Sequence, residues 1–172
     1  MGANGITTGS SGAEVGAERP ARIATHRVLG EGALQSMRAF IETELPLHEP
    51  DVDWGLVTWL RIRLVHDRTD ESQQPIGSAQ AARIHIGAAL NAGESLYEVL
   101  DADSADLEAL YSVFFEDGEL RQEYCQGAGS DLLYIRHIEL EPDWEERNVD
   151  LALVRRLCDT LGEGCELAVM GV

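Results

Sequence analysis

The segment from residue 131 to residue 172 constrains the fold more than any other part of the chain. It begins with a run rich in β-branched and aromatic residues, Leu132 to Leu140, and continues through a turn marked by Pro142. A helical pattern from Asp150 to Leu161 and a second apolar run from Cys165 to Val172 follow. This order predicts a strand, a helix and a second strand. Such a unit usually has parallel strands, a right-handed crossover, and a ligand site where the first strand ends and the helix begins.

The motifs in this segment are similar to those of one known family. The matching positions in the first strand and its exit are Leu133, Tyr134, Ile135, Ile138, Glu139, Leu140, Pro142 and Trp144. The helix matches over residues 151–157, which read LALVRRL. These residues resemble the GNAT superfamily of acyl-CoA-dependent N-acetyltransferases, over about a quarter of the chain. The resemblance implies an α/β fold with a mixed sheet, in which antiparallel N-terminal strands precede a parallel β-α-β unit.

The resemblance also implies transfer of an acetyl group from acetyl-CoA to an amine. In that family the loop before the helix directs its backbone N–H groups toward the cofactor pyrophosphate, at the positive end of the helix. The cofactor-binding positions that it implies here are Ile138, Glu139, Leu140, Glu146, Arg147, Asn148, Val149, Asp150 and Leu151.

The loop of this chain differs from the family pattern. Glu145 stands where the family has Arg or Gln, and Asn148 and Asp150 stand at the two glycine positions. Residues 131–150 contain seven acids against two bases, a net charge of minus five. One carboxylate about 6 Å from a phosphate costs roughly 3 kcal/mol, against about 0.3–1 kcal/mol gained from a helix terminus. The alternative interpretation is structural, with Asp150 capping the helix and the neighbouring acids complementing its dipole.

Two side chains on the predicted strand are candidates for catalysis. Acyl transfer to an amine needs a base for the amine, N–H groups for the oxyanion and a proton for the departing thiolate. Strand alternation places His137 and Glu139 on one face, so either is a candidate base. The alternation predicts the opposite face for Tyr134, Arg136, Ile138 and Leu140. The alternative is a structural role, which is more frequent for a lone histidine on a strand covered on both sides.

The net charge of −18 restricts the partners of this 172-residue chain. It disfavours nucleic acids and anionic membranes and favours a cationic amine or a basic peptide, although solubility alone is an alternative reason for such acidity. The sequence has no apolar run as long as a membrane span and no signal-peptide pattern, so we expect a cytoplasmic protein. Cys125, Cys158 and Cys165 show no C-x-x-C spacing, and no metal site or disulfide framework is predicted.

The upstream segments complete one predicted domain, residues 21–172, preceded by a flexible arm over residues 1–20 that is rich in Gly, Ser, Thr and Ala. The elements expected first are a strand at Arg22–Leu29, an amphipathic helix at Ala33–Leu45, and an antiparallel hairpin of Trp54–Val65 with Pro75–Ile86. Residues 93–124 read as helical, with a short helix from Ser95 and cap chemistry before a second helix. The apolar side of that second helix consists of Leu107, Leu110, Tyr111, Phe114 and Phe115.

Two functions follow from these observations. The first is an N-acetyltransferase of the GNAT type. The family pattern continues with a further helix and strands, and with a tyrosine that donates a proton, beyond the point where this sequence stops. A naturally shortened protein, a truncated sequence and a fold completed by a partner are the alternatives. The second is therefore a catalytically inactive GNAT-like acidic binding or regulatory module, which forms oligomers through exposed strand edges.

Overall fold

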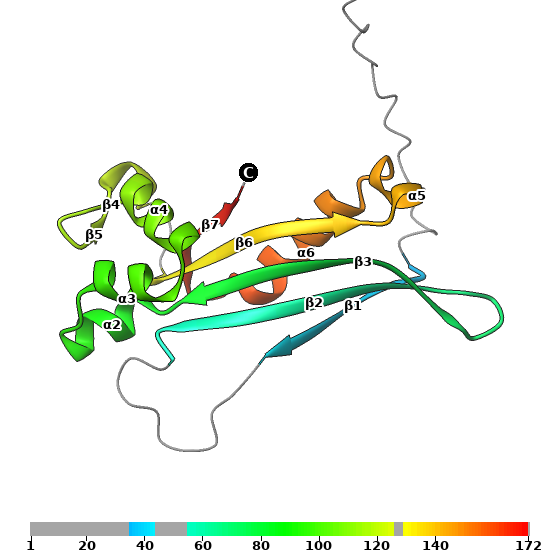
Figure 1. The fold of residues 1–172 in the computed structure, drawn as a ribbon, viewed down its shortest axis with the longest axis horizontal. Coiled ribbons are helices and arrows are strands. Elements are labelled where there is room, and N and C mark those ends of the chain that lie inside the picture. Colours follow the sequence, from blue (N-terminus) through cyan, green and yellow to red (C-terminus); the bar gives the residue numbers. More distant parts are fainter. Residues whose placement is uncertain (1–34, 44–54, 126–128, 172) are drawn as a thin grey trace, which may run out of the picture.

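The computed structural model describes residues 35–43, 55–125 and 129–171. The elements in chain order are β1 (Met37–Thr43), β2 (Val57–Asp67), β3 (Gln73–Ile84), α2 (Ile86–Ala92), α3 (Leu96–Asp103), α4 (Ala105–Phe114), β4 (Phe115–Glu116), β5 (Glu119–Leu120), the 3₁₀ turn η1 (Gln122–Tyr124), β6 (Asp131–Leu140), α5 (Pro142–Glu145), α6 (Val149–Leu161) and β7 (Cys165–Met170). Figure 1 shows a long twisted sheet with α2, α3 and α4 gathered at one end. The predicted arm over residues 1–20 and the predicted strand at Arg22–Leu29 lie outside the described residues.

The main sheet has the strand order β1-β2-β3-β6-β7. The first three pairings are antiparallel, and β6 and β7 are parallel. The predicted strand–helix–strand unit with parallel strands is therefore confirmed, as is the predicted hairpin, which β2 and β3 form. The fold is mixed α/β with a mostly antiparallel sheet.

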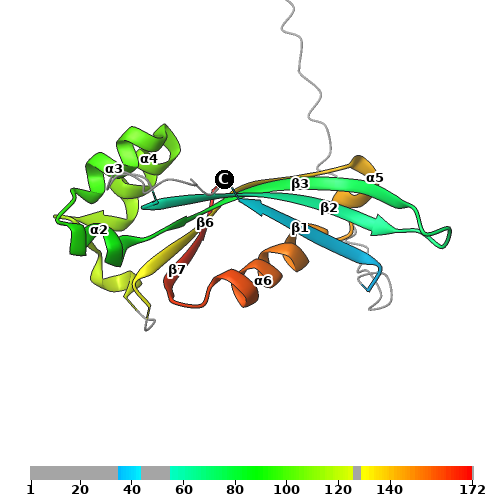
Figure 2. The ribbon, with the colours of Figure 1, turned by 90° about the horizontal axis from the view of Figure 1, so that it is seen from below.

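Helices cover the two faces of the sheet unequally. Figure 2 shows α3 and α4 above one end of the sheet and α6 beneath it, and these two sides are called the upper and lower faces below. The upper-face core includes Ala82, Ile84, Leu132 and Tyr134 of the sheet, with Leu96, Leu100, Leu107 and Leu110 of the helices. The lower-face core includes Leu60, Ile62, Ala81, Leu133 and Ile135, with Trp144, Val149, Leu153 and Leu157. The predicted apolar side of the second helix belongs to the upper core.

Local sequence signals explain the starts of the two longer upper helices. The hydroxyl oxygens of Ser95 and Ser104 accept hydrogen bonds from the N–H groups of Glu98 and Leu107, at 3.4 and 3.3 Å. These N-caps satisfy donors that a helix start leaves unpaired. The prediction of helices with cap chemistry in this region is confirmed for α3 and α4. The helical prediction is wrong for residues 115–120, which form the short hairpin β4–β5.

The amphipathic helix predicted for Ala33–Leu45 is wrong in the part that the structure describes. Residues 37–43 form β1, which pairs with β2 from Met37 opposite His66 to Thr43 opposite Leu60. The apolar residues have helical spacing, but they are few enough to suit a strand as well. Pairing with β2 satisfies the backbone groups of an edge strand, and this non-local gain overrides the local pattern.

A β-bulge at Arg136 changes which side chains of β6 share a face. Gln80 of β3 lies opposite His137 and Ala81 lies opposite Ile135, so Arg136 is an extra residue without a direct partner in β3. The prediction that Tyr134, Ile138 and Leu140 share one face is therefore wrong. Tyr134 belongs to the upper core, whereas Ile138 and Leu140 pack with the lower core. A single inserted residue shifts the alternation and leaves later side chains on the opposite face.

Candidate functional site

The candidate site lies where β7 stops pairing with β6. The pairing runs from Asp131 opposite Cys165 to Ile135 opposite Met170. The Gly171 N–H then donates to the carbonyl of Ile135, at 2.8 Å. Beyond this point β6 continues to Leu140 and α5, as Figure 1 shows. Among the residues that the structure describes, no strand pairs with this last part of β6 on the β7 side, and we call it the open edge.

Two residues direct backbone groups to the open edge. The Glu141 N–H donates to the Ile76 carbonyl at 2.9 Å, so the polar groups of Glu141 point toward β3. Because backbone direction alternates along a strand, the N–H and C=O groups of Leu140 and Ile138 point away from β3, into the open edge. Glu139, the third strand position predicted to bind cofactor, instead directs its backbone groups toward Ser78 of β3.

The loop after β6 is anchored by an aromatic side chain. Trp144 in α5 is 7 % exposed and belongs to the lower core. The guanidinium carbon of Arg147 lies 4.6 Å from the centroid of the Trp144 ring, and the His66 ring lies 5.1 Å from it on β2. The predicted cofactor-binding Arg147 therefore stacks on the loop itself, while its neighbour Glu146 is exposed.

The start of α6 has a left-handed backbone at Asn148, one of the two positions where the resembled motif has glycine. Asn148 has φ 56° and ψ 30°, in the left-handed region, where Asn costs less than most residues. Asn148 is also the N-cap residue, and its side chain makes no capping hydrogen bond. The prediction that Asp150 caps the helix is wrong, because Asp150 lies within the first turn. The N–H groups of the first turn thus lack a side-chain cap.

The remaining predicted residues of this turn have different environments. Val149 is 4 % exposed and packs into the lower core, whereas Leu151 is 63 % exposed. The acids Glu145 and Glu146 are exposed, and Asp150 is half-buried. Any anion at the start of α6 would therefore meet exposed carboxylates, whose repulsion water and salt reduce.

The two predicted catalytic residues lie on the same side of the sheet. His137 is opposite Gln80 and Glu139 is opposite Ser78, and both side chains are exposed. Since Ile138 and Leu140 face the lower core, alternation assigns Glu139 to the upper face. The upper face beside the open edge therefore contains an exposed carboxylate.

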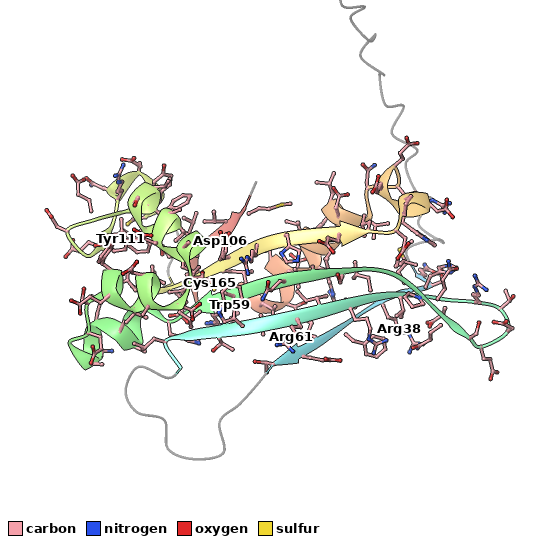
Figure 3. The ribbon with its side chains drawn as sticks, viewed as in Figure 1. Arg38, Trp59, Arg61, Asp106, Tyr111 and Cys165 are labelled. Carbon is pink, nitrogen blue, oxygen red and sulfur yellow. The ribbon has the colours of Figure 1, made fainter. Side chains whose placement is uncertain are left out.

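A polar cluster on the upper face was not foreseen from the sequence. The guanidinium of Arg136 donates to Asp106 at 2.5 Å and to Gln80 at 3.2 Å, and its carbon lies 5.7 Å from the Trp59 ring centroid. The Trp59 indole N–H donates to Asp103 at 2.8 Å. Figure 3 labels Trp59 on β2 and Asp106 at the start of α4. These residues are far apart in the sequence, so no local pattern indicates the cluster.

Tyr134 completes this side of the site. It is 7 % exposed, and its hydroxyl oxygen lies 3.0 Å from the position that a Cβ on Gly171 would occupy. The hydroxyl is therefore at the end of β7, where the two parallel strands separate. Burial raises the pKa of Tyr134, the nearby Asp106 carboxylate raises it further, and Arg136 partly opposes both. The phenol thus keeps its proton at neutral pH and has one to donate.

Comparisons of the chain with protein-family models, curated proteins and solved structures found no match. Within the described ranges, no helix is both long and apolar enough to span a membrane. The same ranges contain no group of three or more His, Cys, Asp or Glu residues arranged to hold a metal ion.

Proposed function

We propose that this chain binds acetyl-CoA at the open edge of β6 and transfers the acetyl group to an amine, in a GNAT-type fold. The main support is the open edge itself, where backbone groups of Ile138 and Leu140 point away from β3. An extended ligand with amide groups, such as the pantetheine arm of CoA, pairs with such an edge in the way that an added strand does. The parallel β6–α6–β7 unit matches the arrangement that the sequence resemblance implies.

The start of α6 is a suitable position for the diphosphate of CoA. The helix has 13 residues and no side-chain cap, so its first N–H groups are available to an anion. Asn148 supplies the left-handed backbone that glycine supplies in the family motif. The exposed acids Glu145 and Glu146 oppose an anion, and we therefore expect weak binding that strengthens with added salt.

The side chains on the upper face supply the proton transfers. Glu139 or His137 accepts a proton from the attacking amine while its nitrogen bonds to the acyl carbon. A backbone N–H of the open edge stabilises the oxyanion that forms. The carbon–sulfur bond then breaks, and the Tyr134 hydroxyl donates a proton to the departing thiolate. Tyr134 thus takes the role for which the sequence offered no candidate.

The second candidate function is a GNAT-like acidic module that binds a partner without catalysis. It is favoured by the acids around the loop, Glu145, Glu146 and Asp150, and by the net charge of −18. A cationic amine or a basic peptide is the partner that this charge favours. The open edge would then pair with a strand of another chain, so an oligomer is expected.

Calorimetry and thermal shift with acetyl-CoA separate the two functions. At about 100 times its dissociation constant, a ligand adds roughly 2.7 kcal/mol of stability. The informative variant is the triple substitution Glu145→Arg, Asn148→Gly and Asp150→Gly, which should tighten binding. Glu116→Arg, at an exposed position in β4, makes the same charge change as Glu145→Arg away from the loop, so it is the charge control and should leave binding unchanged.

The outcomes are distinct. Binding by the native chain, with acetylation of a polyamine or a basic peptide detected by mass spectrometry, supports the enzyme. Loss of that acetylation in Glu139→Gln or His137→Gln, with binding retained, identifies the base. Absence of binding in both the native chain and the triple variant at millimolar acetyl-CoA would refute the enzyme and leave the binding module.

A further inference from the structure

A hydroxyl, an imidazole and a carboxylate form a chain of hydrogen bonds at the other end of β6. Thr58 lies near the start of β2, His85 directly follows β3, and Asp131 is the first residue of β6. The Thr58 Oγ1 and His85 Nε2 atoms are 3.0 Å apart, and the His85 Nδ1 and Asp131 Oδ2 atoms are 3.1 Å apart. Three strands that are adjacent in the sheet therefore bring together residues that are distant in the sequence.

The order of these bonds assigns a role to each group. Because a carboxylate only accepts hydrogen bonds, a neutral His85 beside Asp131 donates from Nδ1, and its Nε2 is then the acceptor. The Thr58 hydroxyl then donates to Nε2. A hydroxyl bonded to a base that a third group orients is the arrangement that activates a nucleophile, and both distances lie within the range of about 2.6–3.2 Å.

The carboxylate is held in place independently of the imidazole. The Asp131 side chain is 12 % exposed, and Arg83 Nε donates to the same Oδ2 atom at 2.9 Å. Arg83 is itself fixed from the far side, because its guanidinium donates to the carbonyl of Glu163 at 3.0 Å. The Asp131 carboxylate is therefore held in a fixed position, as an orienting group must be.

The hydrogen bond between Thr58 and His85 is not needed to compensate these two side chains for lost contact with water. The His85 side chain is 28 % exposed and Thr58 is half-buried, so water can satisfy both groups. Arg83 alone would satisfy the buried oxygen of Asp131. The same exposure makes Thr58 and His85 accessible to a small ligand from solvent.

We propose that Thr58 is the nucleophile of a second site, which hydrolyses small acyl esters, with His85 as general base and Asp131 as a positioning residue. The site is independent of the proposed acetyl-CoA site, because Asp131 and Leu140 are the two ends of β6. The branched carbon of threonine crowds its hydroxyl, so the site accepts short acyl groups such as acetyl.

The reaction has two steps. Thr58 Oγ1 bonds to the acyl carbon while His85 Nε2 takes the hydroxyl proton; the ester carbon–oxygen bond breaks, and the alcohol leaves with that proton. Water then attacks the acyl group on Thr58 and gives its proton to His85. The bond between the acyl carbon and Thr58 Oγ1 breaks, His85 returns the proton to Oγ1, and the carboxylic acid is released.

The test uses a fluorophosphonate and p-nitrophenyl acetate on the full chain, with peptide mass spectrometry to locate the adduct. The expected result is a phosphonyl adduct on Thr58 and hydrolysis of the ester. Thr58→Val keeps the side-chain shape and should abolish both, whereas Thr58→Ser, with a less crowded hydroxyl, should retain or accelerate both. The matched control is Thr160→Val, at an exposed position in α6, which should change neither.

The rate of adduct formation tests the roles of His85 and Asp131. His85→Gln should lower the rate of adduct formation by about 10²–10⁴-fold, and Asp131→Asn should lower it without removing the hydroxyl. Thermal denaturation of Thr58→Val and Thr58→Ser shows whether each variant is folded. Absence of an adduct in both the native chain and folded Thr58→Ser, or an equal adduct yield in Thr58→Val, would overturn the proposal and leave a structural network.

Discussion

Gly77 is the position where one added methyl group should have the clearest effect on the sheet. It lies in β3 opposite Leu140, on the side of β6 away from the open edge. A Cβ at Gly77 would lie 2.4 Å from the carbonyl oxygen of Glu139 and 3.1 Å from the Cα of Leu140. Both atoms belong to the backbone, so they cannot move aside by rotating a side chain. Gly77 thus permits close packing of two strands, which the sequence alone did not reveal.

Two opposing effects decide the stability of Gly77→Ala. Overpacking in a filled interior costs about 1–3 kcal/mol. Alanine also restricts the unfolded chain more than glycine does, which stabilises the folded state by about 0.4–1 kcal/mol. The clash is larger, so we expect a net loss of about 1–2 kcal/mol. For a domain of this size that loss lowers Tm by about 2–8 °C.

Urea and thermal denaturation followed by circular dichroism measure this loss. Ser78→Ala, at the exposed neighbouring position, is the control and should change stability by less than about 0.5 kcal/mol. The variant should keep the slope of the urea transition, because the clash alters the native state only. A Gly77→Ala protein as stable as the control, or more stable, would refute the close approach of β3 and β6.

Three further results are expected. Leu157 is 1 % exposed, so Leu157→Ala should lower the free energy of unfolding, measured in urea, by about 2–5 kcal/mol. Leu151 is 63 % exposed, so Leu151→Ala should lower it by less than about 0.5 kcal/mol. Similar losses in the two variants would contradict the packing of α6. Asn148→Ala should destabilise the protein by about 1 kcal/mol, because φ is 56° at this position, whereas Asn148→Gly should not. Urea denaturation measures both effects. Iodoacetamide should modify exposed Cys125 before Cys165, whose thiol pKa burial raises; peptide mass spectrometry gives the order, and the reverse order would count against that burial.

The elements that local sequence predicted correctly are those whose signals lie within one segment. The run from Leu132 to Leu140, the helical pattern that follows and the last apolar run correspond to β6, α6 and β7. The start of a short helix near Ser95 and the cap chemistry before the second helix were recognisable, because a cap bonds only two or three residues ahead. The hairpin of β2 and β3 was also predictable from two extended runs joined by polar residues.

The errors arose where distant residues decide the outcome. The stretch around Phe40 has a helical spacing of apolar residues, yet pairing with β2 makes it a strand. The bulge at Arg136 leaves no mark in the sequence, although it decides which face Ile138 and Leu140 occupy. α2 was absent from the predicted elements, because its few residues follow β3 directly and lack an N-cap side chain.

For the candidate site, too, the sequence indicated the features that lie within one segment and missed those that depend on distant residues. The sequence indicated the end of β6 and the start of α6, because a ligand site at that junction follows from a parallel strand–helix–strand unit. It also placed Asn148 at one of the two positions where the resembled motif has glycine. It could not indicate Tyr134, the proposed proton donor, because the end of β7 becomes its neighbour only in the folded sheet.

The sequence by itself determined the parallel unit, the helix caps and the acidic charge, since these depend on residue type and on spacing of a few positions. Only the tertiary structure decided which strands are neighbours, where β6 bulges, and that Thr58, His85 and Asp131 meet. The physical reason is that strand pairing joins backbones across long loops, and its register depends on the packing of both faces at once. A local pattern contains no information about the partner strand.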